Sequence, residues 1–231
     1  HSASEFSSTT LGKLSDFYRN FGMQSSTNSF SFYGHTPLTQ ALLGVQYELS
    51  TKEVTDQLMS LEKNAGKVNL YRNRYCLPLG FLVNIDVQAR THMDSSNPFE
   101  TQNSFVTAAT GCNDNLFSVY KARSGSDLVI DCMLSGRQFI FVEDKLSGIN
   151  VRHERDGAEL SDNDYNNLEN PIIVDLGDVQ AGDKLYITSK DDNVTSFGII
   201  PAVMDYGILD EVMNLLNSYP YEITEFSETY I

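Results

Sequence analysis

The chain has no tryptophan, few basic residues, few cysteines and no long apolar run. Only 16 Lys and Arg stand against 31 Asp and Glu among 231 residues, so the formal net charge is −15. An acidic surface of this kind repels the phosphates of nucleic acids and anionic lipid headgroups, and we therefore expect no nucleic-acid partner. The longest apolar runs, such as 197–204, fall far short of the ~20 residues that span a bilayer.

The cysteines, Cys76, Cys112 and Cys132, are odd in number and include no close pair suited to zinc, which excludes a dense disulfide framework. Cys132 stands in an apolar run and is predicted to be a buried, small hydrophobic residue. No signal peptide opens the chain, and residues 222–231 predict a final strand with nothing after it. We therefore expect the chain to be a piece of a longer protein.

Catalytic motifs are also missing. The chain has no Gly-x-Ser-x-Gly elbow, no phosphate-binding glycine loop and no His-Glu-x-x-His pair. Its four histidines are isolated in sequence. These absences weigh against an independent enzyme and leave binding or structural roles.

One polar segment has the alternating oxygen ligands of a calcium loop, at Asp162, Asp164 and Asn166. The match then fails, because Asn167 replaces the required glycine and Ile173 stands where a bidentate Glu belongs. The Asp-x-Asp pair is also similar to the metal-binding pair of nucleotide-sugar transferases. The simpler interpretation is a polar loop between strands, with calcium as the only cofactor that this segment suggests.

The first half of the chain predicts mixed helices and strands. Apolar residues at helical spacing over 14–21 predict a helix that ends at Gly22. Thr36-Pro37 and Asn97-Pro98 each read as an N-cap followed by the first helical position, and the second helix is expected to run to about 110. Short strands are predicted at 45–49, 58–62, 67–71 and 81–87.

From about residue 116 short strands alternate with turns such as Asp156-Gly157, a pattern typical of a β-sandwich or jelly roll. A helical stripe at 209–216, with Asp205 as its cap, precedes the final strand. The predicted fold class is α+β and β-rich. The expected organisation is an α+β domain over 1–115, a jelly-roll-like β-sandwich over 116–205, and a helix with a truncated strand over 206–231.

Candidate binding residues fall into three groups, each with a simpler structural explanation. Aromatic and ring side chains that could stack on sugars gather at one predicted helix entry; these are Phe32, Tyr33 and His35. Side chains that could hydrogen-bond to sugars gather at another, where capping is the alternative; these are Asn97, Glu100, Gln102 and Asn103. A basic patch that could offset the acidity toward a polyphosphate is predicted from Lys67, Arg72, Arg74 and Arg90.

Three blocks carry a resemblance to a known family. They are Thr36-Pro37-Leu38, Leu77-Pro78-Leu79-Gly80 and Asn97-Pro98-Phe99-Glu100-Thr101-Gln102-Asn103, followed later by 182–184 and 226–231. In this order they resemble the soluble extracytoplasmic region of YfhO-type bacterial membrane proteins, over roughly residues 10–231.

The resemblance implies a multispanning parent protein of the class that transfers sugars from polyprenyl phosphates, on the outer face of the Gram-positive cell membrane. Its catalytic base would lie in an early loop among the membrane helices, so no catalytic residue is assigned here. This chain would be an accessory domain that lies beside its own transmembrane helices. It would bind or position a cell-surface glycopolymer (teichoic acid) or a lipid-linked sugar. The alternative is a carbohydrate-binding or assembly ectodomain of a protein with another role, such as lipid-linked sugar export.

Overall fold

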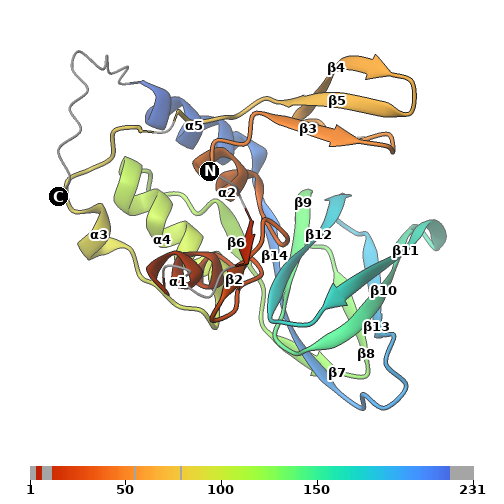
Figure 1. Cartoon of the computed structure of the whole chain (residues 1–231). Helices are drawn as coiled ribbons and strands as arrows, with labels where there is room; N and C mark the ends of the chain where they lie inside the picture. Colours follow the sequence, from red (N-terminus) through yellow and green to blue (C-terminus); the bar gives the residue numbers. More distant parts are fainter. Residues whose placement is uncertain (1–3, 7–11, 55, 79, 219–231) are drawn as a thin grey trace.

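A computed structural model describes residues 4–6, 12–54, 56–78 and 80–218. Two antiparallel sheets form a sandwich, helices gather on the outer side of one of them, and a small three-stranded sheet projects from the body (Figure 1). The α+β, β-rich fold class predicted from the sequence is confirmed.

Five helices are present in the described part of the chain, and their boundaries follow local capping. Thr36 and Thr39 form a reciprocal capping box at the second helix, and Asn97 accepts a hydrogen bond from the N–H group of residue 100. The fourth helix ends at Gly111 in the left-handed conformation that glycine favours. Asp205 caps the last helix as predicted. The helices are α1 (Gly12–Asn20), α2 (Pro37–Leu42), α3 (Val87–Arg90), α4 (Pro98–Thr110) and α5 (Tyr206–Asn217).

The N-terminal half contributes two small sheets. A two-stranded pair joins β1 (Glu5–Phe6) to β2 (Ser29–Phe30). The three-stranded sheet has the order β3-β5-β4. Its strands are β3 (Tyr47–Ser50), β4 (Met59–Ala65) and β5 (Val68–Asn73), and the last two form a hairpin.

The sandwich consists of a four-stranded sheet, in the order β11-β10-β13-β8, and a five-stranded sheet, in the order β12-β9-β14-β6 with β7 also paired to β14. Consecutive strands β12 and β13 lie in different sheets, as in a jelly roll. The strands are β6 (Phe117–Val119), β7 (Arg123–Gly125), β8 (Asp127–Asp131), β9 (Gly136–Val142), β10 (Leu146–Arg155), β11 (Ala158–Leu168), β12 (Ile172–Val179), β13 (Lys184–Ser189) and β14 (Phe197–Met204).

Strand β9 is buried on both faces, which makes it the centre of the fold. Ile140 and Val142 pack into the core between the two sheets. Phe139 and Phe141 point to the opposite face, into a second cluster that also contains Phe99 of α4. Because side chains alternate along a strand, one apolar run serves two cores.

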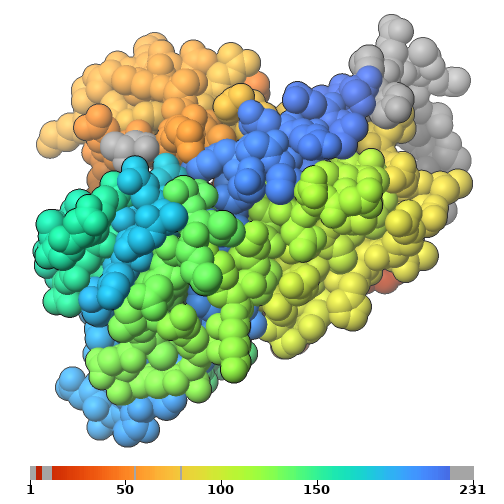
Figure 2. Space-filling view, turned by 180° about the vertical axis from the view of Figure 1, so that it is seen from behind, coloured from red at the N-terminus to blue at the C-terminus, as the bar shows by residue number. Residues whose placement is uncertain are grey.

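Helices α4 and α5 cover the outer face of the five-stranded sheet. Val106 of α4 and the apolar stripe of α5, which includes Leu209 and Val212, belong to the same cluster as Met204 of β14. From behind, α5 lies in blue between the orange three-stranded sheet and the yellow-green α4 (Figure 2). This cluster includes residues from both sides of the proposed boundaries at 115 and 205, and those boundaries stay predictions about folding units.

Several local expectations were wrong. Residues 81–87 form no strand; the segment is irregular and leads into α3, which ends at Arg90. The polar segment with Asp162 is not a loop, because it lies within the 11-residue edge strand β11. A partner strand, β10, overrode the low strand propensity of its Asp and Asn residues. The expected final strand at 222–231 lies outside the described residues.

A buried carboxylate ties the end of the sandwich together. Asp183 is 1% exposed and accepts hydrogen bonds from His153 Nε2 at 2.8 Å and from Arg155 Nε at 2.7 Å. It also accepts from the N–H group of Gln180 at 2.8 Å. The hydrogen bond from Arg155, with those from Gln180 and His153, outweighs burial and lowers the pKa of Asp183.

We expect Asp183→Asn to lower the free energy of unfolding by about 3 kcal/mol at pH 7, because it removes the buried charge that accepts hydrogen bonds from His153 and Arg155. A lowered carboxyl pKa stabilises the fold above the unfolded value of about 4, and this stabilisation is lost as the pH falls. Urea titrations at pH 7 and pH 3 measure the change, with exposed Asp192→Asn as the control. An equal deficit at both pH values would contradict the assignment.

Candidate functional site

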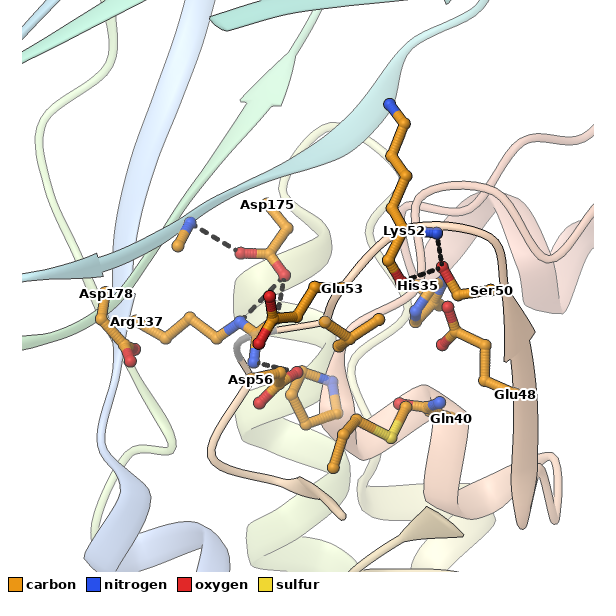
Figure 3. Close-up of a pocket in the computed structure, with 14 residues that line it drawn as sticks. His35, Gln40, Glu48, Ser50, Lys52, Glu53, Asp56, Arg137, Asp175 and Asp178 are labelled. Carbon is orange, nitrogen blue, oxygen red and sulfur yellow. Dashed lines mark hydrogen bonds and ion pairs between the residues drawn. The ribbon is translucent and has the colours of Figure 1, made fainter. Parts of the chain in front are cut away.

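A cavity of about 660 Å³ lies where the N-terminal region meets the sandwich, and we call it the seam pocket. One wall comes from α2, β3 and the loop that follows β3, and the other from β9 and β12 (Figure 3). Five carboxylates and two basic side chains line it. The carboxylates are Glu48, Glu53, Asp56, Asp175 and Asp178, and the basic side chains are Lys52 and Arg137.

Arg137 bridges the two walls. Its Nη1 lies 2.5 Å from Asp56 Oδ2 in the loop, and its Nη2 lies 2.6 Å from Asp175 Oδ2 on β12. Asp175 also accepts from the N–H group of Gly177 at 2.9 Å. Burial opposes the charge of Arg137, but Asp175 and Asp56 outweigh it and raise the pKa of the guanidinium. Arg137 therefore stays positively charged, and two of the five carboxylates, those of Asp56 and Asp175, are paired with it.

His35, a predicted sugar contact, lines the seam pocket. Its ring stacks on Phe32, with centroids 4.0 Å apart and planes 11° apart, and its Nδ1 lies 3.0 Å from the carbonyl oxygen of Phe32. Burial lowers the pKa of His35, against weaker opposing effects of that carbonyl and nearby Asp175. The imidazole is consequently neutral at pH 7 and presents a flat ring.

Gln40 and Glu48 are two further polar residues that line this pocket. Gln40 is 6% exposed, and its Nε2 has no hydrogen-bond partner among the described residues. Burial, then the charge of Asp56, raises the pKa of Glu48. Figure 3 shows both side chains on the wall opposite Asp178.

A second hollow of about 600 Å³ adjoins the seam pocket, because Asp178 lines both. Tyr206 of α5 donates a hydrogen bond to Asp178 at 2.5 Å. Burial and this hydrogen bond raise the pKa of Tyr206 to about 12, so the phenol stays protonated. Asp178 is therefore a wall residue of both hollows.

Two of the predicted amide contacts serve the fold. Gln102, fully buried, donates from Nε2 to the carbonyl oxygen of Phe21 at 3.0 Å and accepts from Thr36 Oγ1 at 2.7 Å. Asn103 donates to the carbonyl oxygen of Phe117 and accepts from its N–H group, at 2.9 and 2.8 Å.

The other predicted residues are dispersed. Tyr33 donates to the carbonyl oxygen of Asn166 on β11 at 2.9 Å and lies outside the seam pocket lining. Glu100, with Asn103 and Arg90, lines a separate hollow of about 260 Å³, and Asn97 caps α4.

The predicted basic patch is also divided by local pairing. Arg72 contacts Glu62 at 3.3 Å and Arg74 contacts Asp210 at 3.2 Å, both at exposed positions. Of the eleven candidates, His35 alone lines the seam pocket, and a role in binding stays a prediction for all of them.

The candidate calcium ligands alternate along β11. Asp164 contacts Lys190 Nζ at 2.6 Å, and Asn150 donates to both Asp162 and Asp164. Asn166 accepts from the same Lys190 at 2.9 Å. In the described part of the chain no group of three or more His, Cys, Asp or Glu side chains is arranged to hold a metal ion. Calcium binding at this strand stays a prediction.

A sequence model of the family described as "Bacterial membrane protein YfhO" matches residues 1–226. The chain belongs to the YfhO family. Within the described ranges, none of the helices of this YfhO-family chain has the length and apolar character needed to cross a bilayer. No curated protein matches it.

Solved structures give only weak similarity to the YfhO-family chain. Hydroxypropylphosphonic acid epoxidase from S. wedmorenis is 9% identical, with a TM-score of 0.26, over 39% of this chain and 44% of that one. CapF with the inhibitor 3-isopropenyl-tropolone is 12% identical, with a TM-score of 0.24, over 52% of this chain and 40% of that one. The chain thus spans less than half the length of either structure, and similarities at these scores carry no argument about function.

Sequence reasoning missed most of the seam pocket of the YfhO-family chain. Two apolar strands did carry a usable signal: Arg137 is the second residue of Gly136–Val142, and Asp175 interrupts Ile172–Val179. Charged residues are rarely buried without a partner, so two opposite charges in core strands predict a pair. Gln40 and Glu48 gave no comparable signal.

We expect Gln102→Leu to lower the free energy of unfolding by about 2 kcal/mol, because the carbonyl of Phe21 and the hydroxyl of Thr36 lose their buried partners. Chemical denaturation measures this, and Gln88→Leu on the exposed face of α3 is the matched control. Equal stability of the two variants would show that the amide does not hold α4 in place.

Glu48→Gln should raise the melting temperature at pH 7. A raised carboxyl pKa means that the folded state disfavours the charged form, so the penalty applies above the raised pKa and disappears below the unfolded value of about 4. Thermal melts at pH 7 and pH 4 should show a gain at the first and none at the second. A destabilised variant at pH 7 would instead indicate that the carboxylate has a stabilising partner.

Proposed function

We propose that this chain is an extracytoplasmic accessory domain of a membrane glycosyltransferase-like protein, and that it binds a cell-surface glycopolymer such as teichoic acid at the seam pocket. Membership in a family of bacterial membrane proteins supports the membrane context. The seam pocket, built jointly by the N-terminal region and the sandwich, is the observation that carries the proposal. Chemistry would reside in the membrane part of the parent protein.

The lining of the seam pocket supports a hydroxyl-rich ligand. Its volume of about 660 Å³ lies within the usual range for small-molecule sites, but such sites are usually mostly apolar. Carboxylates that accept hydrogen bonds dominate here, and charge-assisted hydrogen bonds are stronger than neutral ones. His35 on Phe32 adds a flat ring face beside them. Sugar rings present both hydroxyl donors and apolar C–H faces.

Two side chains that could take part in nucleophilic catalysis, Cys132 and His153, have structural roles instead. This supports an accessory role for the chain. Burial, with Asp183 and Asp131, raises the pKa of Cys132 to about 12, so its thiolate is not available at neutral pH. His153 is engaged with buried Asp183. The proposal therefore assigns binding, and no bond cleavage, to this region.

A second candidate function is an assembly ectodomain of a membrane protein with another role, such as lipid-linked sugar export. Its supporting observation is the apolar exposure on the projecting three-stranded sheet, where Tyr47, Leu49 and Leu61 are all exposed. In that case Leu49→Ser would impair assembly of the full-length protein, and the isolated chain would not bind polymer.

Calorimetric titration of the chain with purified teichoic acid tests the first candidate. Asp178→Asn and Glu53→Gln should each weaken binding about tenfold, since a hydrogen bond to a charged group contributes roughly 1.5 kcal/mol. Glu159→Gln on β11, outside the pocket lining, is the matched control and should bind like the unmodified chain. Absence of binding by the unmodified chain would reject acceptor binding, and unchanged affinity in both variants would reject this pocket.

A further inference from the structure

The three-stranded sheet projects from the body, so one of its faces is turned toward the seam pocket and the other away from it (Figure 1). Glu48 and Ser50 of β3 line the pocket, and Tyr71 of β5, which stands opposite Glu48, is 4% exposed. Because side chains alternate along a strand, the residues between them point the other way. We call this second side the outer face. It carries Tyr47, Leu49, Lys63, Val68, Leu70 and Arg72.

The outer face is apolar at its centre. Tyr47 is 48% exposed and Leu49 is 71% exposed, and Leu49 stands directly opposite Leu70. Val68 and Leu70 are half-buried. A group of exposed apolar side chains marks an interaction site more often than single ones do. A tyrosine beside them suits the boundary between an apolar and an aqueous medium, because its ring is apolar and its hydroxyl is polar.

The rim of the outer face is basic, although the whole chain has a formal net charge of −15. Lys63 on β4 and Lys67 in the hairpin turn are exposed, and neither has an ion pair among the described residues. Arg72 is also exposed and is paired with Glu62 at 3.3 Å. The other carboxylates of residues 47–74 line the seam pocket. The two unpaired lysines therefore leave the outer face locally positive.

The size of the outer face favours a lipid surface over a protein partner. Its strands are 4, 7 and 6 residues long. With strands about 4.8 Å apart and a rise of about 3.3 Å per residue, they cover roughly 250 Å². A stable protein interface buries about 800 Å² on each partner. A bilayer surface imposes no such minimum, since it takes up single apolar side chains between its headgroups while lysines contact the lipid phosphates.

We infer that the outer face docks on an anionic lipid surface, with Tyr47 and Leu49 inserted among the headgroups and with Lys63 and Lys67 against the lipid phosphates. Membership in a family of bacterial membrane proteins supports a lipid surface as the neighbour of this chain. The acidic remainder of the chain does not prevent docking, because exposed charges more than about 8 Å apart are largely screened at physiological salt. The inference is independent of polymer binding at the seam pocket.

The absence of tryptophan makes insertion measurable. The full chain with Leu49→Trp carries a single tryptophan, and it is mixed with vesicles of equal parts phosphatidylglycerol and phosphatidylcholine at about 0.15 M salt. We expect a blue-shifted emission maximum and quenching by lipids with brominated acyl chains. Leu160→Trp is the matched control and should show neither change, because Leu160 is 50% exposed on β11, in a different sheet.

Charge and apolar contact are tested separately by flotation of tryptophan-free variants with the same vesicles. Lys63→Glu should weaken binding at least about tenfold, because it replaces attraction to the anionic surface with repulsion. Leu49→Ser should weaken it about tenfold through lost apolar transfer. Lys13→Glu gives the same net charge as Lys63→Glu, but α1 lies well away from the three-stranded sheet, so this control should bind like the unmodified chain (Figure 1). All three positions are exposed, and an unchanged Tm shows that the variants are folded.

The outcomes distinguish the inference from the proposed function. Binding that Lys63→Glu does not weaken overturns the inference, as does an equal blue shift at positions 49 and 160. Equal binding to vesicles of phosphatidylcholine alone also overturns it. If the unmodified chain does not float with the anionic vesicles, the inference is rejected and the outer face fits the protein partner of the second candidate function. None of these results affects teichoic acid binding at the seam pocket, which is measured on its own.

Discussion

The ion bridge from Arg137 to Asp56 and Asp175 is the interaction on which the site depends. It links the loop before β4 to the five-stranded sheet, and it sets the width of the cavity between them. A buried bridge of this kind contributes little net stability, because desolvation offsets the attraction between the charges. It does specify geometry, since a guanidinium fork accepts its two carboxylates in fixed directions. The bridge therefore acts as a spacer that keeps two walls apart at a defined distance.

The spacer works because its anchor is rigid. Arg137 is the second residue of β9, whose later residues alternate between the inter-sheet core and the cluster beneath α4 and α5. A strand packed on both faces cannot shift without disturbing two cores at once. By contrast, the opposite wall of the pocket comes from a short helix, a small sheet and a loop. The pocket thus pairs one fixed wall with one less constrained wall, and the bridge joins them.

Helix starts, turns and the succession of sandwich strands could be predicted because they depend on local chemistry. Thr36-Pro37, Asn97-Pro98 and Asp205 each cap a helix where capping rules place it. Strand β11 could not be predicted in this way, because its polar residues form a strand only through pairing with β10. The seam pocket depends on contacts between residues far apart in the sequence, such as Asp56 with Arg137, which no local pattern encodes. The candidate amides were recognised as important, but spacing alone does not separate a ligand contact from a contact with the main chain.

Gln102 and Asn103 recognise peptide groups of Phe21 and Phe117, and these contacts do not involve the phenylalanine rings. A side chain that hydrogen-bonds to a peptide group can do so whichever amino acid that peptide group belongs to. Substitutions at the two recognised positions are therefore limited by ring packing alone, while the amides themselves have almost no chemical substitute. A short segment such as Asn97-Pro98-Phe99-Glu100-Thr101-Gln102-Asn103 can in this way keep its amino-acid sequence while the sequences of the segments that it contacts change. Its value as an identifying mark comes from the main-chain contacts of Gln102 and Asn103.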